Sequence, residues 1–214
     1  MNTISFLNVL PRVFAQAQDL ESEVWNRELT LEKGRLYLLE ASSGKGKSTF
    51  CSYIAGYRHD FTGDLLFDKQ DVSRLSADDW TQIRRSQISL LFQELRLFPE
   101  LTAWENVEIK NQLTRWKSRG QILEYFDELG IGNKVDEKVG RMSFGQQQRV
   151  ALIRALVQPF DFLLADEPIS HLDEDNARVM GDILMREVRE QGAALLVTSI
   201  GKHMQLPYDL TIRL

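Results

Sequence analysis

The sequence predicts an α/β protein built on a doubly wound parallel sheet, with a helical lobe inserted into it. Three short segments carry this prediction, because residues 34–41, 160–167 and 193–199 are apolar at consecutive positions, as parallel strands covered on both faces are. Helical patterns over 48–57 and 173–191 follow the first segment and precede the third. Alternating strands and helices indicate a parallel sheet, which binds ligands at the carboxyl ends of its strands.

Length and composition fit one large globular domain, with 214 residues of which 43% are hydrophobic and 27% charged. The net charge is −5 and no run of five like charges occurs, so we expect no nucleic-acid partner. The single cysteine, Cys51, lies among apolar residues and is expected to be a buried helix residue in a reducing compartment. Pro11 and Arg12 interrupt the N-terminal apolar stretch, and no apolar run is long enough to span a membrane. We therefore expect a cytoplasmic chain, or one held at a membrane by something else.

The first predicted strand leads into a loop that fits most of the phosphate-binding pattern G-x-x-x-x-G-K-[ST]. Backbone amides of such a loop cradle phosphates, Lys47 is expected to reach the outer phosphates, and Ser48 is expected to bind Mg²⁺. Ala41 stands where the first glycine belongs, but this position turns the chain out of the strand, so a methyl is tolerable there if φ is negative. The residues expected to bind nucleotide in this loop are Ala41, Ser42, Ser43, Gly44, Lys45, Gly46, Lys47, Ser48 and Thr49.

Two carboxylates follow the second predicted strand, in the sequence LLADEP. Asp166 at the strand end is expected to join the magnesium shell, and Glu167 beside it is expected to polarise the attacking water. Together with the phosphate loop, the pair indicates an ATPase that uses ATP and Mg²⁺.

Residues 94–157 contain no convincing strand and show three amphipathic helical patterns, over 104–116, 119–130 and 145–157. Pro159 ends the last of them. We expect one domain, in which residues 1–93 and 158–214 form the core and 94–157 form the inserted helical lobe.

The sequence MSFGQQQR, at 142–149, resembles the L-S-G-G-Q signature of ATP-binding cassette (ABC) ATPases. The other motifs of that family follow in the same order: the phosphate loop, LLFQE with Gln93, the signature, LLADEP, and SHLD with Asp173 as the D-loop. Residues 97–107, LFPELTAWENV, resemble the segment found in importer-like and in lipoprotein-release or macrolide-export-like subunits of that family. As a whole, the chain resembles the lipoprotein-release, macrolide-export and cell-division branch. The resemblance covers essentially the whole chain.

This resemblance implies a P-loop NTPase core of the RecA type, in a subunit that dimerises head to tail around two ATP molecules, as a homodimer or a heterodimer. Gln93 would act as a metal ligand and in catalysis, and the lobe beside it would grip an integral membrane transporter subunit. That partner would hold the chain at the inner face of the membrane. Phe14 is the candidate for stacking on adenine, Trp25 is a second, and a core role is an alternative for both. The residues expected to face the ATP of the opposing subunit are Ser143, Phe144, Gly145 and Gln146.

Two further departures from the family pattern bear on mechanism. Phe144 replaces the first signature glycine, and either it places a large side chain near the dimer interface or it turns outward and packs within the lobe. Ser199 stands where the family has a histidine that contacts the γ-phosphate. His203 lies about one helical turn further on if a helix begins there, but we favour the interpretation that it is an ordinary surface residue. Since one transition-state contact is worth about 10²–10³ in rate, we expect slow hydrolysis.

The expected function is that of an ATP-hydrolysing subunit that powers a separate membrane partner. The alternative is a regulatory or mechanotransmitting subunit that binds ATP and dimerises without moving a substrate, because both use the same motifs. A DNA-repair cassette would need a long coiled-coil insertion between Gln93 and Ser143, and a metabolite kinase would not carry the signature. The sequence of this chain does not identify the transported substrate.

Overall fold

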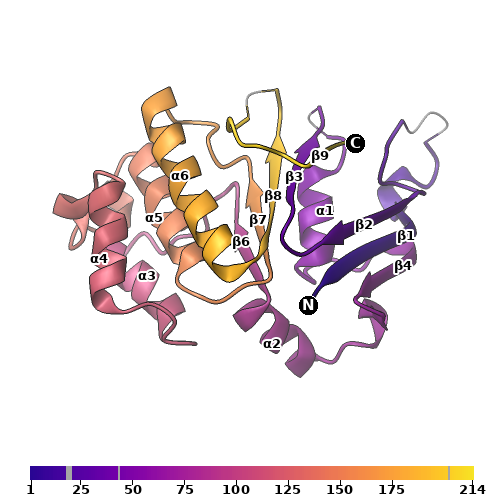
Figure 1. The fold of residues 1–214 in the computed structure, drawn as a ribbon, viewed down its shortest axis with the longest axis horizontal. Coiled ribbons are helices and arrows are strands. Elements are labelled where there is room, and N and C mark those ends of the chain that lie inside the picture. The colour runs from indigo at the N-terminus through magenta and orange to yellow at the C-terminus, as the bar shows by residue number, and fades with distance from the viewer. Residues whose placement is uncertain (18–20, 43, 202) are drawn as a thin grey trace.

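The structure is a computed structural model that describes residues 1–17, 21–42, 44–201 and 203–214. Figure 1 shows two sheets with the first helix, α1, between them. The predicted α/β fold is confirmed by a five-stranded sheet in the order β6-β7-β8-β3-β9, in which every recorded pair of strands is parallel. Its strands are β3 (Leu36–Glu40), β6 (Ile88–Leu91), β7 (Phe162–Asp166), β8 (Ala194–Ser199) and β9 (Leu210–Arg213).

Helices accompany both sheets. In the described part of the chain the α-helices are α1 (Lys47–Ile54), α2 (Ala77–Ser86), α3 (Ala103–Asn111), α4 (Arg119–Glu128), α5 (Phe144–Leu156) and α6 (Glu174–Gln191). The short 3₁₀ helices are η1 (Arg12–Phe14), η2 (Val72–Arg74), η3 (Gly132–Lys134) and η4 (Val139–Arg141). None of the helices in the described ranges is both long enough and apolar enough to cross a membrane.

Four strands of the parallel sheet, β3, β6, β7 and β8, are buried on both faces, which explains why they are apolar at mostly consecutive positions, whereas the edge strand β9 is largely exposed. In β3, Leu36 and Leu38 join a core cluster with α5 and α6, whereas Tyr37 and Leu39 join a second cluster with α1, β1 and β4. Successive side chains of a strand point to opposite faces. Each strand of this kind therefore contributes to two cores at once.

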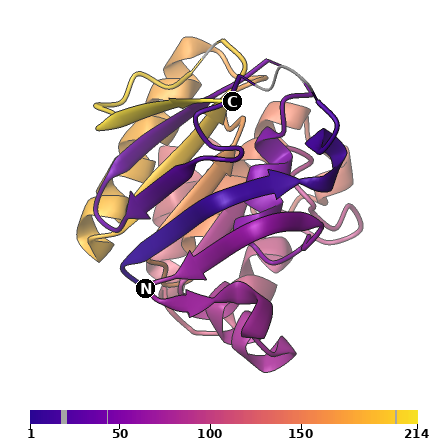
Figure 2. The ribbon, with the colours of Figure 1, turned by 90° about the vertical axis from the view of Figure 1, so that its right-hand side faces the viewer.

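The second sheet, in the order β2-β1-β4-β5, is antiparallel and was not predicted from the sequence. Its strands are β1 (Thr3–Pro11), β2 (Glu28–Glu32), β4 (Phe61–Phe67) and β5 (Gln70–Asp71). Figure 2 shows it nearest the viewer, in front of the rest of the molecule. The pairing of β1 with β4 shifts register near Asn8, and a Cβ on Gly63 would lie 2.3 Å from the Asn8 carbonyl oxygen. Only glycine fits that close backbone approach.

The helices α3, α4 and α5 lie between β6 and β7 in the sequence. Each begins with a capping box, in which Thr102, Ser118 or Ser143 accepts a hydrogen bond from the third helical residue. The α3 helix ends at Asn111, before the end of the predicted pattern at 116. The Asn111 side chain bonds the backbone of Lys117 through both its amide atoms and so closes the turn after the helix.

A buried ion pair joins this helical region to α6. Lys117 Nζ lies 2.8 Å from Glu187 Oε2, and the two side chains are 8% and 2% exposed. The Tyr125 hydroxyl of α4 donates to the other carboxylate oxygen of Glu187. Nearer the surface, Arg186 donates both terminal amines to Glu128.

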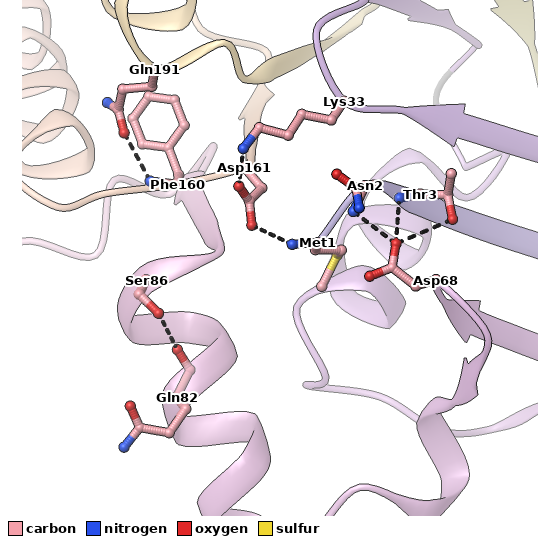
Figure 3. Close-up of polar contacts among 10 residues, drawn as sticks. All are labelled: Met1, Asn2, Thr3, Lys33, Asp68, Gln82, Ser86, Phe160, Asp161 and Gln191. Atoms are coloured by element: carbon pink, nitrogen blue, oxygen red, sulfur yellow. Dashed lines mark hydrogen bonds and ion pairs between the residues drawn. The ribbon is translucent and has the colours of Figure 1, made fainter.

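Asp161, at the amino end of β7, connects the two sheets. Figure 3 shows its carboxylate between Lys33 of the β2–β3 turn and the Met1 amino group, which lies 2.7 Å away. Asp68 holds the start of β1 in the same way, accepting the backbone N–H groups of Asn2 and Thr3.

Candidate active site

The carboxyl ends of β3, β7 and β8 lie side by side, which brings distant predicted residues together. Glu40 pairs with Ser199, and Asp166 pairs with Thr198. The loop after β3, the two carboxylates of β7 and the residue at the end of β8 therefore share one edge of the sheet. This edge is where parallel sheets bind their ligands.

The phosphate loop turns on two glycines with positive φ, Gly44 at 80° and Gly46 at 100°. Gly46 precedes α1, and a Cβ there would lie 3.0 Å from the Phe14 ring and 3.1 Å from the Trp25 ring. Both its backbone conformation and its neighbours therefore require glycine. Ala41 is not among the described residues with positive φ, so the backbone at this position accommodates a methyl group. Ser43 lies outside the described residues.

Lys47 is the first residue of α1 and is only 5% exposed. Its ammonium donates to the carbonyl oxygens of Ala41 at 2.9 Å and Ser42 at 3.3 Å. Burial lowers the pKa of Lys47, while Glu167 and Asp166 oppose that shift. The charge is thus held inside the loop, next to the amides that α1 leaves unpaired at its start.

Ser48 and Asp166 form a set of oxygen donors of the kind that Mg²⁺ prefers. The Ser48 hydroxyl donates to Asp166 Oδ2 at 3.1 Å, and the Thr198 hydroxyl donates to Oδ1 of the same carboxylate. Mg²⁺ in phosphate sites takes one or two carboxylates together with phosphate oxygens and water. The residues present fit that ion.

Glu167 has the backbone conformation of a strained site residue, with φ at 49°. Its N–H donates to Thr198 Oγ1 at 3.1 Å, its Oε2 accepts from Gln93 at 3.4 Å, and its Oε1 lies 3.9 Å from Lys47 Nζ. Burial raises the pKa of Glu167, Lys47 lowers it, the Asp166 charge raises it, and His171 lowers it; the net direction is upward. A carboxylate with a raised pKa beside a lysine is suited to accept a proton.

Lys47, Ser48, Gln93 and Glu167 line one cleft, with a volume of about 360 Å³. It brings together most of the predicted nucleotide-binding residues with Gln93 and Glu167. The full lining is Val13, Phe14, Gly44, Gly46, Lys47, Ser48, Thr49, Arg58, Gln93, Glu167 and Ile200.

Phe14 and Trp25 occupy different places around this cleft. Phe14 is half-buried and lines it, whereas Trp25 is 2% exposed and packs edge-on against Phe50 and Tyr53. The Trp25 indole donates to the Lys45 carbonyl at 3.2 Å. Trp25 therefore supports the loop from the core.

The signature residues do not line the cleft. Ser143 caps α5 and accepts from the Gln146 N–H at 3.3 Å. Phe144 is 44% exposed and lies edge-on to His171, with ring centroids 4.6 Å apart. The ring therefore turns toward the D-loop and not into the lobe. Asp173 caps α6, where it accepts from the Asn176 N–H at 2.8 Å.

Ser199 is 2% exposed, and its carbonyl accepts from the Ala41 N–H at 3.3 Å. In the described part of 200–209 no helix begins, so His203 is not one helical turn beyond it. Instead His203 Nδ1 lies 3.8 Å from Glu40 Oε1, and its ring packs edge-on against Tyr208.

Two residues of the site were missed by the sequence analysis. Thr198 bridges Asp166 and the Glu167 backbone, and its position directly before Ser199 at the end of a predicted strand was the available signal. Arg58 lines the cleft and donates to the Thr49 hydroxyl at 3.0 Å. No pattern in the sequence marks Arg58.

Known proteins are similar to this chain in sequence and in fold. The chain is 31% identical over 211 residues to the lipoprotein-releasing system ATP-binding protein LolD of Novosphingobium aromaticivorans, covering 97% of this chain and 94% of that protein. It is 32% identical over 194 residues to the macrolide export ATP-binding/permease protein MacB of a Shewanella species, covering 88% of this chain and 29% of that protein.

Two solved structures of the cassette MJ0796 agree with the whole arrangement, each at 28% identity over 92% of this chain and 87% of the other. One is the dimeric cassette of a bacterial ABC transporter, with a TM-score of 0.79, and the other is a dimer in a post-hydrolysis state bound to ADP and Pi, with a TM-score of 0.77. The profile of the ABC transporter family matches residues 24–170. The chain therefore belongs to the ABC transporter family, as the ATP-binding, ATP-hydrolysing subunit that powers a membrane partner.

Proposed function

We propose that the chain hydrolyses ATP slowly, with Mg²⁺, at the cleft beside the carboxyl ends of β3, β7 and β8. Lys47 and the amides of the phosphate loop would bind the phosphates, Ser48, Asp166 and Gln93 would hold the metal, and Glu167 would accept the proton of the attacking water. The metal would neutralise phosphate charge when bound. The observation that carries this proposal is the hydrogen-bonded set Ser48, Asp166, Thr198 and Glu167 beside Lys47.

Slow turnover follows from Ser199, because no histidine stands at that position to contact the γ-phosphate. We expect Ser199→His to raise steady-state turnover by about 10²-fold, the lower end of what one preorganised transition-state contact supplies. The assay compares purified wild type with this variant at saturating ATP. A wild-type turnover of roughly 10 s⁻¹, the median for enzymes, unchanged by the histidine, would refute slow hydrolysis.

Hydrolysis would take place in a head-to-tail dimer, with Ser143, Phe144, Gly145 and Gln146 presented to the ATP of the opposing subunit. Two observations support this: the signature residues lie outside the chain's own cleft, and the related cassette MJ0796 is dimeric. Asp173 would contact the opposing subunit as part of the D-loop. Whether the second copy is identical would be read from the mass of the ATP-bound complex of the Glu167→Gln variant.

The membrane partner would dock in a second hollow, of about 330 Å³, beside the residues that follow β6. We propose residues 94–157 as the lobe that forms one side of it and the core as the other. Four large apolar side chains in it are 48–51% exposed: Tyr57, Phe98, Ile109 and Leu113. Its cationic residues are Arg84, Arg96, Lys110 and Arg154, and the described residues that line it include no acidic one. An apolar segment with acidic side chains is the complementary partner.

Leu113→Asp and Phe98→Asp test this docking site. Each should abolish co-purification with an integral membrane protein from cells that express the chain, while leaving binding of a fluorescent ATP analogue unchanged. Glu28→Gln, a change at an exposed residue of β2 outside the hollow, is the control. Variants that retain the membrane protein as the wild type does would refute the site. This docking would place the chain at the inner face of the membrane, and relatives named for lipoprotein release and macrolide export make that branch the proposed one.

A further inference from the structure

An exposed pair of aromatic rings lies next to the signature serine, and the proposed catalytic scheme gives the contact between the two rings no role. Phe144 is the first residue of α5, and His171 lies in the loop between β7 and α6. Their ring centroids are 4.6 Å apart with an interplanar angle of 78°. This is the edge-to-face geometry that aromatic pairs prefer.

Two further contacts join the start of α5 to the same loop. The Gln148 side chain donates to the Pro168 carbonyl, and a Cβ on Gly145 would lie 3.4 Å from the Leu172 side chain. Pro168 and Leu172 are buried, whereas the Phe144–His171 pair is on the surface. The ring pair is therefore the outermost of three contacts between α5 and the loop.

The loop begins at Glu167, so its position sets the position of that carboxylate. The Ser170 N–H donates to the Glu167 carbonyl at 3.4 Å, which folds the loop back on its first residue. Burial raises the pKa of the Glu167 carboxyl most strongly; Lys47 lowers it, Asp166 raises it, and His171 is also close enough to lower it. Glu167 keeps a positive φ that costs about 1–3 kcal/mol unless its surroundings hold it.

The other two histidines of the chain are held elsewhere. His59 packs edge-on against Trp80. His203 lines a small cavity together with Glu167, but its ring is placed between Glu40 and Tyr208. His171 is the one that shares a hydrogen-bonded loop with Glu167.

We propose that His171, held by Phe144, is a positioning residue for Glu167. The inference rests on the proposed role of Glu167 in hydrolysis. It gives Phe144 a function inside its own subunit: the ring that replaces a signature glycine fixes the loop that carries the carboxylate. It also links the helix start that is presented to the opposing ATP with the carboxylate of the subunit's own site.

The test is a kinetic double-mutant cycle on the full chain. His171→Ala should lower kcat by between roughly tenfold and 10²-fold, the range that a small misplacement of a reacting group produces, with the KM for ATP within about twofold, because only groups placed for the transition state change. Phe144→Leu should also lower kcat, and Phe144→Tyr, which keeps a ring, should lower kcat less. The double variant should lose no more than the worse single variant, since one contact carries both effects.

The same cycle is run in the Ser199→His background, so that a slow wild type cannot hide the effect. Thermal unfolding and binding of a fluorescent ATP analogue check that each variant is folded. An unchanged kcat in His171→Ala, a change in KM alone, or losses that multiply in the double variant would each overturn the proposal. So would a loss in His203→Gln that His171→Ala does not show. If Glu167→Gln itself leaves kcat unchanged, the proposed role of Glu167 fails, and that result is distinct from the failure of His171 alone.

Discussion

The Ser48 hydroxyl donates to the Asp166 carboxylate at 3.1 Å, across 118 residues of sequence. This single hydrogen bond joins the start of α1 to the end of β7. Thr198 fixes the other oxygen of the same carboxylate. The fold itself thus holds the two proposed metal ligands together, which lowers the cost of assembling the site.

Asp166→Asn should reduce Mg²⁺-dependent hydrolysis by at least about 10²-fold, because it removes the one charged ligand of the set while keeping its shape. ATP binding in the presence of EDTA should stay the same in the variant and the wild type. The measurement is ATPase rate and ATP affinity across a Mg²⁺ titration. Ser48→Ala, which removes a neutral ligand, should have the smaller effect, and the reverse order would contradict the assignment.

Glu167→Gln should lower kcat by about 10²–10⁴, the range for loss of a general base. It should leave ATP affinity nearly unchanged, since the new amide oxygen can still accept from Gln93 and the backbone N–H of residue 167 still donates to the Thr198 hydroxyl. Single-turnover hydrolysis and equilibrium binding separate the two effects. Glu94→Gln, a carboxylate next to Gln93 that is 72% exposed, is the matched control and should behave as wild type.

The sequence predicted three of the parallel strands, β3, β7 and β8, because they are apolar at consecutive positions, as Leu38, Leu164 and Leu196 illustrate. It did not predict the antiparallel sheet. There, β1 pairs with β4 more than fifty residues away, and β4 begins with the largely exposed residues 61–64. Long-range pairing of half-exposed strands leaves no local signature strong enough to identify them.

The residues of the site also fall into those that a local motif identifies and those that only the packing brings together. The phosphate loop and LLADEP are local motifs, so Lys47, Ser48, Asp166 and Glu167 could be identified as candidate site residues from the sequence alone. The Phe144–His171 contact joins residues from two separate elements, and it depends on how α5 packs on the loop after β7. Such a contact is a property of the packing, which no single segment encodes.

Phe14 and Trp25 should respond oppositely to truncation. Phe14→Ala should weaken ATP binding by about 1–3 kcal/mol, the value of stacking one base on an aromatic ring, with little change in stability. Trp25→Ala should instead lower the free energy of unfolding by about 3–5 kcal/mol, because it empties a fully packed core position. ATP titration and urea unfolding on both variants check this. A loss of stability in Phe14→Ala without a loss of ATP affinity would show that Phe14 has a core role and does not stack on adenine.

The ion pair of Lys117 and Glu187 predicts a stability effect far from the nucleotide. Glu187→Ala leaves the Lys117 ammonium buried without its charge partner and also removes the acceptor of the Tyr125 hydroxyl. We expect the free energy of unfolding to fall by about 3–5 kcal/mol, measured by urea denaturation. Lys117→Met should cost a similar amount, and Lys117→Met combined with Glu187→Leu should recover part of the loss, because no unpaired charge remains.

The exposed pair of Arg186 and Glu128 provides the control, since Glu128→Ala should cost about 0–1 kcal/mol. Equal losses at Glu187 and Glu128 would show that burial of the first pair does not govern its contribution.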